Sequence, residues 1–266
     1  GSTPPPRGSP PPVPPAFDAP QPENEAQALA RERGLRPEPA PVGGDPARMR
    51  IADATRYIFA IRTNVILIIA SACGYFFLAG IQTFGVEYVE KQYRVNTLLA
   101  NPVMIVIGLG AVAGVLTGGT LGDALLRKRY LNARVMSSAV PAAVSVVLFL
   151  PAILTRSLVT AVPYLTGAAF FLSVQQAPIN AARLDIMPAP LWGRAEGYRS
   201  AIRTAAQALA PPVFGFLADV IGRGGNVRGG LEWAFLLMLI PLAAGAVLLF
   251  RALSSYPQDV ANATGA

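Results

Sequence analysis

Residues 119–129 have the sequence GTLGDALLRKR. In this stretch two glycines and the single carboxylate of Asp123 end a long apolar run, and basic residues follow. Residues 215–223, GFLADVIGR, repeat part of the pattern at the end of another apolar run. Basic residues after a long apolar run are typical of a helix that leaves a membrane. The recurrence therefore predicts a protein with several membrane spans built from related units.

The composition also indicates a membrane protein. Hydrophobic residues make up 53% of the chain and charged residues 14%, with a mean hydropathy of +0.44, whereas soluble domains carry about 25% charged residues. A membrane span needs roughly 20 residues of helix, because backbone groups in lipid must be hydrogen-bonded within the segment. We therefore predict an all-α membrane protein whose bundle occupies residues 63–256. Its six transmembrane helices are expected near residues 64–86, 101–125, 132–154, 158–181, 200–221 and 231–251.

The segments that flank the bundle differ from it in character. Residues 1–46 hold 14 of the 25 prolines, which predicts a disordered, extended linker or tail with a marginal helix from Glu23 to Arg33. Residues 47–62 place Ile51 and Ile58 on one face with arginines beside it, which predicts an interfacial amphipathic helix on the membrane surface. Residues 257–266 are expected to form a cytoplasmic tail.

Lysines and arginines near the span ends fall unequally on the two sides of the membrane. Thirteen lie on the side that holds both termini, and five lie on the other side. By the positive-inside rule, both termini are therefore expected in the cytoplasm. Because the formal net charge of +7 is explained by this orientation, nucleic acid is not an expected partner.

The sequence contains few of the residue types that catalysis or metal binding requires. It contains no histidine and a single cysteine, Cys73, so the usual ligands of zinc or haem are missing. We expect no cofactor and no enzyme activity, because the sequence shows no catalytic Ser/His/Asp set and no phosphate-binding loop. No Asp or Glu lies in the middle of a predicted span, which places any proton-coupling carboxylate on helices outside this chain. Because the chain starts at Gly1, a fragment of a longer protein is expected.

Glycines recur at four-residue intervals along the second predicted span. Gly110, Gly114 and Gly118 lie near one helix face, and Gly122 continues the series. Small residues at this spacing let a neighbouring backbone approach closely in a membrane. We therefore predict that this face packs against another helix.

Polar side chains inside a span are costly unless they face a cavity or a partner. Stripes of such residues lie on the first, fourth and fifth spans, and we propose as candidates for the substrate path Tyr75, Gln176, Asn180, Arg203 and Gln207. An alternative for Arg203, and for Arg199 one turn before it, is that the side chain extends to the lipid headgroups.

The pattern Gly119-x-Leu121-Gly122-Asp123-x-x-x-Arg127-Lys128 resembles the loop signature of the major facilitator superfamily. Residues 185–197 and 212–219 are similar to the second cytoplasmic connection of that family and to the helix after it. The resemblance covers about residues 50–256 and matches the carboxyl-terminal six-helix half of a twelve-helix carrier. Ala124 and Leu126 depart from the signature. The first span and the loops also resemble the Spinster-like carriers, some of which move lysolipids or sphingoid phosphates.

The resemblance implies secondary active or facilitative transport of a small or amphipathic solute by alternating access. It implies a cytoplasmic gating loop made of Gly119, Gly122, Asp123, Arg127 and Lys128, with Asp123 and Arg127 tying the loop to helix ends. The expected partners are the lipid bilayer, the solute, and either a missing amino-terminal half or a second copy. The expected location is a bacterial plasma membrane. Two alternatives remain: a non-transporting scaffold that recruits a partner through its proline-rich tail, and a permease subunit of an ATP-driven importer.

Overall fold

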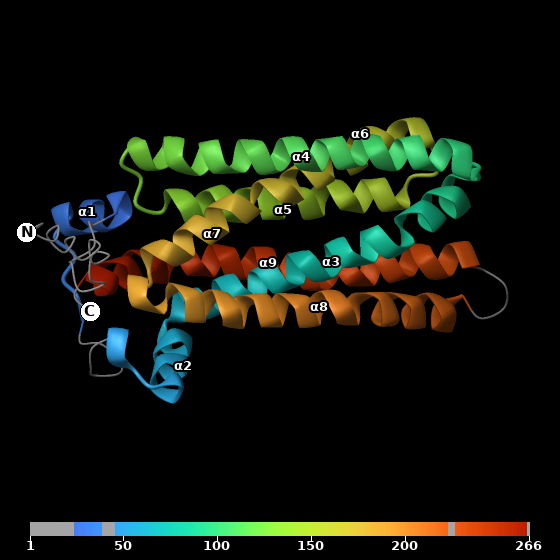
Figure 1. Cartoon of the computed structure of the whole chain (residues 1–266). Coiled ribbons are helices and arrows are strands. Elements are labelled where there is room, and N and C mark those ends of the chain that lie inside the picture. Colours follow the sequence, from blue (N-terminus) through green and yellow to red (C-terminus); the bar gives the residue numbers. More distant parts are fainter. Residues whose placement is uncertain (1–23, 39–45, 223–226, 265–266) are drawn as a thin grey trace, which may run out of the picture.

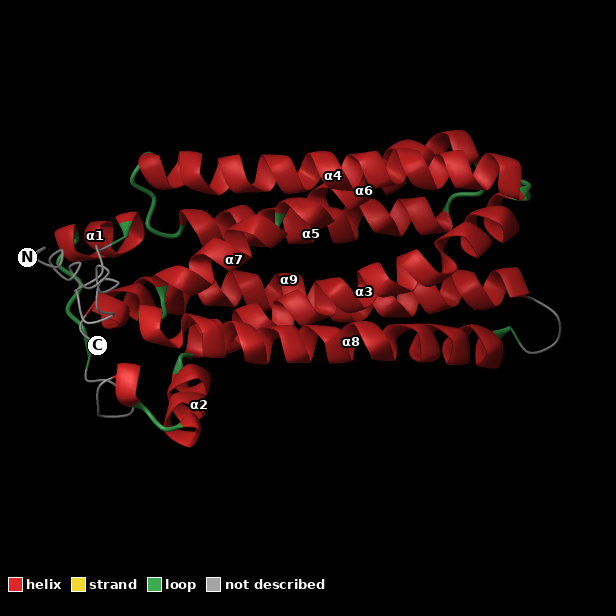
Figure 2. Ribbon diagram, in the orientation of Figure 1, coloured by secondary structure: helices red, strands yellow, loops and turns green. Residues whose placement is uncertain are grey.

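The computed structural model describes residues 24–38, 46–222 and 227–264. Within these ranges every regular element is a helix (Figure 2). Of the residues 1–46 predicted to be a disordered linker or tail, residues 1–23 and 39–45 lie outside the described part of the chain, and residues 24–38 include a helix. The predicted helix at Glu23–Arg33 corresponds to α1, Glu25–Glu32.

Long helices run side by side and form the bundle (Figure 1). Within the described ranges, six helical segments are long and apolar enough to cross a membrane, if α6 and α7 are taken together as one. This confirms the predicted all-α class with six spans. The helices are α3 (Arg62–Tyr93), α4 (Thr97–Arg127), α5 (Ala133–Leu154), α6 (Leu158–Val174), α7 (Gln176–Asp185), α8 (Trp192–Ile221) and α9 (Val227–Thr264).

Several helices extend beyond the apolar runs that predicted them. The first span continues to Tyr93, where Tyr88 and Tyr93 donate hydrogen bonds to the carbonyls of Ile153 (2.8 Å) and Ala152 (3.0 Å) on α5. The last span continues to Thr264, so that the expected tail from residue 257 is helical almost to its end. These extra turns are amphipathic and are held by packing against neighbouring helices, which a hydropathy window does not detect.

The fourth span is interrupted at Gln175, between α6 and α7. Three residues later comes Pro178, which has no N–H and whose ring excludes the carbonyl of residue 174. The Val174 carbonyl is therefore released from the helical hydrogen-bond ladder. This break divides a stretch that the sequence predicted as a single helix.

The glycine face of α4 packs directly on the backbone of α6. A Cβ atom built on any of three glycines would clash with a carbonyl oxygen of α6, the pairs being Gly110 with Thr166, Gly114 with Phe170 and Gly118 with Val174. Such close approach of backbones is characteristic of membrane helices joined by small residues. The released carbonyl of Val174 thus lies against the last of these glycines.

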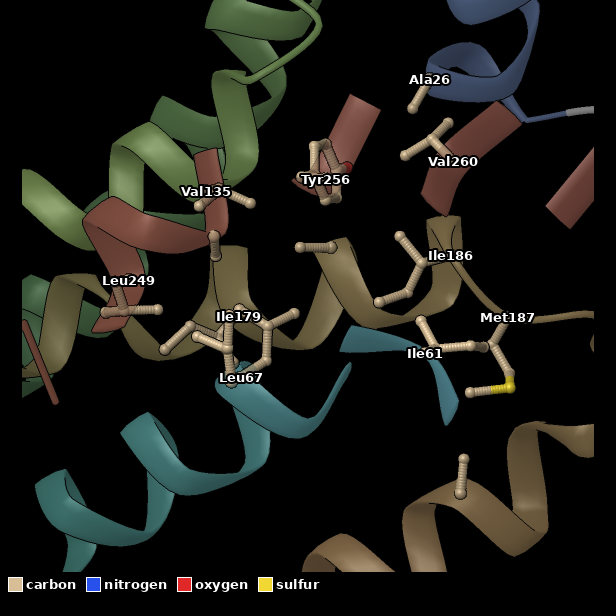
Figure 3. Packing of buried hydrophobic residues seen from close by; sticks show 14 of the residues in the cluster. Ala26, Ile61, Leu67, Val135, Ile179, Ile186, Met187, Leu249, Tyr256 and Val260 are labelled. Carbon is tan, nitrogen blue, oxygen red and sulfur yellow. The ribbon is translucent and has the colours of Figure 1, made fainter. Parts of the chain in front are cut away.

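Two apolar clusters fill the interior of the bundle. The first cluster lies at the end where α1, α2 and the last turns of α9 meet (Figure 1), which is called here the terminal end. Its members include Leu67, Ile179, Leu249 and Tyr256 (Figure 3). The second lies toward the opposite end, called here the far end, and is centred on Phe77, whose ring centroid is 4.8 Å from that of Phe149.

The helix at the start of the bundle lies within residues 47–62, which were predicted to form an interfacial amphipathic helix. In α2 (Ile51–Ala60), the face that carries Ala54 and Ile58 is buried against the rest of the protein, while Ile51 is exposed. An apolar face predicted to lie in lipid is therefore mostly used for packing within the chain. Short 3-10 helices at Pro46–Arg48 and Ala189–Leu191 complete the described elements.

We predict that Gly114→Ala and Gly118→Ala each lower the free energy of unfolding by about 1–3 kcal/mol, since overpacking forces α4 and α6 apart. Thermal unfolding of the purified chain in detergent measures the effect. Gly108→Ala is the matched control on the same helix, because a Cβ there meets no heavy atom within 4 Å. Equal unfolding temperatures for Gly118→Ala and Gly108→Ala would contradict the close contact.

Candidate functional site

Helices α3 and α8 bring together two of the residues that the sequence assigned to the substrate path. The guanidinium carbon of Arg203 lies 5.0 Å from the ring centroid of Tyr75, a distance at which a cation is attracted to the face of an aromatic ring. The Nε atom of Arg203 is buried and has no hydrogen-bond partner. Arg203 is therefore directed toward a neighbouring helix and is not extended to the membrane surface.

The break between α6 and α7 places two amide side chains beside α3. A Cβ built on Gly74 would lie 3.5 Å from the Nε2 atoms of both Gln175 and Gln176, so both amides lie against α3 at the residue before Tyr75. Nε2 of Gln175 and Oε1 of Gln176 are buried without hydrogen-bond partners. Of these residues the sequence pointed to Gln176. Gln175 was missed because its burial depends on the helix break.

The two remaining path candidates stand apart from this group. Asn180 is exposed on α7, and Gln207 is half-buried on α8, one turn beyond Arg203. Among the described residues, no hydrogen bond joins either amide to the pair of Tyr75 and Arg203. We therefore define the polar site by Tyr75, Gln175, Gln176 and Arg203.

At the terminal end, the loop between α4 and α5 is tied to its surroundings by Arg134. The Nη2 atom of Arg134 lies 3.7 Å from Oδ1 of Asp123. The other two charged residues assigned to the loop, Arg127 and Lys128, are exposed. Gly122 is buried against Pro178, and a Cβ built on Gly119 would lie 3.9 Å from the Cβ of Ala177, so that both glycines pack near the start of α7.

Arg134 also belongs to a buried network that joins three helices. Its Nη1 atom forms an ion pair with Asp185 at the end of α7, whose side chain is 1% exposed. The fully buried Tyr256 of α9 donates a hydrogen bond from its hydroxyl to the same carboxylate. The sequence shows these charges at helix ends but not their pairing, because the partners are far apart along the chain.

A second ion network lies where α7 leads into α8. Glu196 accepts hydrogen bonds from Nη1 of Arg183 at 2.8 Å and from Nη2 of Arg199 at 2.6 Å. The hydroxyl of Ser200 is a further donor at 3.2 Å. Two guanidinium groups therefore share one carboxylate. One alternative from the sequence placed the Arg199 side chain among the lipid headgroups, whereas in the structure this side chain is buried and bound to Glu196.

An apolar cavity of about 280 Å³ lies toward the far end of the bundle. It is walled by aromatic residues such as Phe77, Tyr88 and Phe149, and Gln82 and Ser173 are among its few polar lining residues. Ser173 lies one turn before Gln176, so the cavity begins close to the polar site. A ligand bound between the two would meet polar groups at one end and apolar surface at the other.

Comparison with protein families identifies the chain. The model of the Organic Anion Transporter Polypeptide (OATP) family matches residues 21–159, slightly more than half of the sequence. The chain belongs to the OATP family. This family is of the major facilitator type, which confirms the resemblance seen in the loop signature. Comparison with curated protein sequences gives no match.

Solved structures support the fold of this OATP-family chain. A bacterial homolog of the human lysosomal transporter Spinster, inward-facing and unoccupied, matches with a TM-score of 0.69 at 17% identity, over 82% of this chain and 53% of that one. Its inward-facing, occupied form matches with a TM-score of 0.63 at 15% identity, over 76% and 51%. The chain thus spans about half the length of this transporter and has the fold of one six-helix half.

We predict that Arg134→Gln destabilises the OATP-family chain far more than Asp123→Asn. Loss of Arg134 leaves buried Asp185 without its counter-charge, which costs about 3–5 kcal/mol. Asp123 is exposed, and an exposed ion pair contributes about 0–1 kcal/mol. Thermal unfolding of both variants in the same detergent checks the difference. Similar losses of stability would show that Asp185 does not depend on Arg134.

Proposed function

We propose that the chain is the carboxyl-terminal half of a secondary active or facilitative carrier that moves amphipathic organic anions by alternating access. The observation that carries the proposal is the guanidinium of Arg203, which stands inside a span over the ring of Tyr75. Among the described residues, no carboxylate forms an ion pair with it. Its counter-charge would then come from the solute.

The groups around Arg203 favour an anion as the bound species. A charge within a membrane span is costly unless it is paired, and an unpaired buried N–H of a charged group adds a desolvation penalty. Gln175, whose amide lies against Gly74 on α3, has an unbonded N–H donor, and such donors are suited to carboxylate or sulfate oxygens. The name of the matching family points to the same class of solute. The apolar cavity close to the polar site would accept the apolar part of the solute.

A six-helix unit needs a second unit to close such a path. Much of the apolar surface of α4 and α8 is exposed, for example at Leu109 on α4 and at Leu209 and Phe216 on α8. Lipid can cover part of this surface, but a polar site would need a water-filled cavity between two halves. We propose that a missing amino-terminal half supplies the other wall, with a second copy as the alternative. The proposed location is a bacterial plasma membrane.

The charge distribution supports a cytoplasmic terminal end. The basic residues after α4 and before α3 lie at that end, as the positive-inside rule requires of the cytoplasmic side. In this orientation the segment from Gly119 to Lys128 forms a cytoplasmic gating loop. Asp123 would bias the gate through its contact with Arg134 rather than through Arg127, which is exposed.

We predict that Arg203→Gln lowers the uptake of a fluorescent organic anion at least tenfold, because the charge of the solute loses its counter-ion. Uptake is measured in proteoliposomes that hold the full-length carrier. Arg251→Gln is the matched control, since Arg251 is exposed on α9. Undiminished uptake by Arg203→Gln would exclude Arg203 from the path.

We predict that Asp123→Asn slows transport and changes the ratio of the two gate states by up to about fivefold, as expected from a contact worth about 0–1 kcal/mol. The readout is the initial uptake rate, which should fall. The yield of folded protein is measured beside it and should not change. Asp219→Asn serves as control, because Asp219 occupies a similar sequence pattern but lies at the far end of α8. An unchanged rate for Asp123→Asn would count against its role in the gate.

A further inference from the structure

The network of Arg183, Glu196 and Arg199 has an unusual balance of exposure. The side chains of both arginines are 7% exposed, whereas that of Glu196 is 47% exposed. Guanidinium groups fixed by burial need a counter-charge at all times. Within this network only the Glu196 carboxylate has access to solvent. Glu196 is therefore the residue whose side chain can move away from the two guanidinium groups.

The same network is short of one negative charge. Two guanidinium groups face a single carboxylate, and they are close enough to repel each other. Nε of Arg183 and Nη1 of Arg199 are buried and have no hydrogen-bond partner. Unbonded donors of a charged group inside a protein are costly, and they indicate an acceptor that the protein itself does not supply.

Space for such an acceptor exists next to the network. A pocket of about 270 Å³ is lined by Arg183 and Glu196, with Leu184, Met187 and Trp192 among its other lining residues. A water molecule occupies about 30 Å³ in the liquid, so the pocket has room for an oxyanion. The indole N–H of Trp192 donates to the carbonyl of Met187 at 2.8 Å, which fixes the ring at the pocket wall.

We propose that Arg183 and Arg199 form an anion-binding site that takes a sulfate or phosphate group, and that Glu196 is its exchangeable internal occupant. Guanidinium groups bind such oxyanions through paired N–H donors. An incoming sulfate or phosphate displaces Glu196, which moves toward solvent, and its two negative charges balance both guanidinium groups, which the single charge of Glu196 does not. A carboxylate would only exchange one single charge for another.

The site is separate from the one at Tyr75 and does not rest on the transport proposal. Arg199 precedes Arg203 by four residues on α8, so the two guanidinium groups stand about one helical turn apart on one face. Arg203 contacts α3, whereas Arg199 is held by Glu196 on its own helix. The two positions are therefore consecutive anion sites toward the terminal end, and each can be tested without the other.

The chain contains a reporter for this pocket. It has two tryptophans, and Trp233 lies at the opposite end of the bundle near the start of α9. In a Trp233→Phe background, the emission of Trp192 reports on the pocket alone. The probe is sodium sulfate, titrated at constant ionic strength into the full chain in phosphatidylcholine nanodiscs.

We expect a saturable change of Trp192 emission that Arg199→Gln abolishes. This variant leaves one arginine and one carboxylate, a balanced pair, so it should still fold. Glu196→Gln should bind sulfate about tenfold more tightly, because the competing internal carboxylate is gone, and sulfate should raise its unfolding temperature. Glu87→Gln, an exposed carboxylate at the far end, should behave like the parent protein.

Phosphatidylglycerol nanodiscs distinguish the source of the anion. The comparison is made at high ionic strength, where the negative surface potential of the lipid is screened. A weaker apparent affinity for sulfate in these discs would then assign the site to lipid headgroups, and an unchanged affinity would assign it to soluble anions. Either result supports the site. The proposal is overturned if the parent protein and Arg199→Gln respond to sulfate alike, or if Glu196→Gln folds and binds sulfate no more tightly than the parent protein.

Discussion

Pro178 removes one backbone hydrogen bond from the fourth span, and the two amides of the polar site lie at the break that results. The released carbonyl of Val174 lies against Gly118 of α4, where a side chain would clash with it. At the same break the amides of Gln175 and Gln176 leave the regular course of the helix and lie beside α3. The position of the two amides thus follows from one missing N–H, whereas the close packing at Gly118 continues the contact that Gly110 and Gly114 make with α6.

The two ion networks at the terminal end use arginine in opposite ways. Arg134 lies between the carboxylates of Asp185 and Asp123, so its charge is fully compensated and serves to hold helices together. Around Glu196 the ratio is reversed, with two guanidinium groups for one carboxylate. Because a buried charge must be compensated, the first network is complete within the chain, whereas the second requires something from outside it.

Sequence reasoning succeeded where a property repeats along the chain and failed where it depends on contacts. Six apolar runs predict the spans, because burial in lipid acts on whole segments. The pairing of Arg134 with Asp185 and Tyr256 could not be predicted, since these residues are widely separated in sequence and meet through tertiary packing. The same limit applies to α2, whose apolar pattern is equally consistent with lipid and with the bundle surface that it covers.

The segment before the first span is part of the bundle and not only a connection to it. Glu32 of α1 pairs with Arg129, and Arg33 donates to the carbonyl of Arg129 at 2.6 Å. Arg129 has a positive φ of 65°, a conformation that costs a residue other than glycine about 1–2 kcal/mol. Gln27 donates to the backbone carbonyl of Asp185 at 3.1 Å. Contacts from α1 therefore support both the strained turn after α4 and the end of α7, so the shape of the proposed gating loop depends on a helix that lies outside the membrane spans.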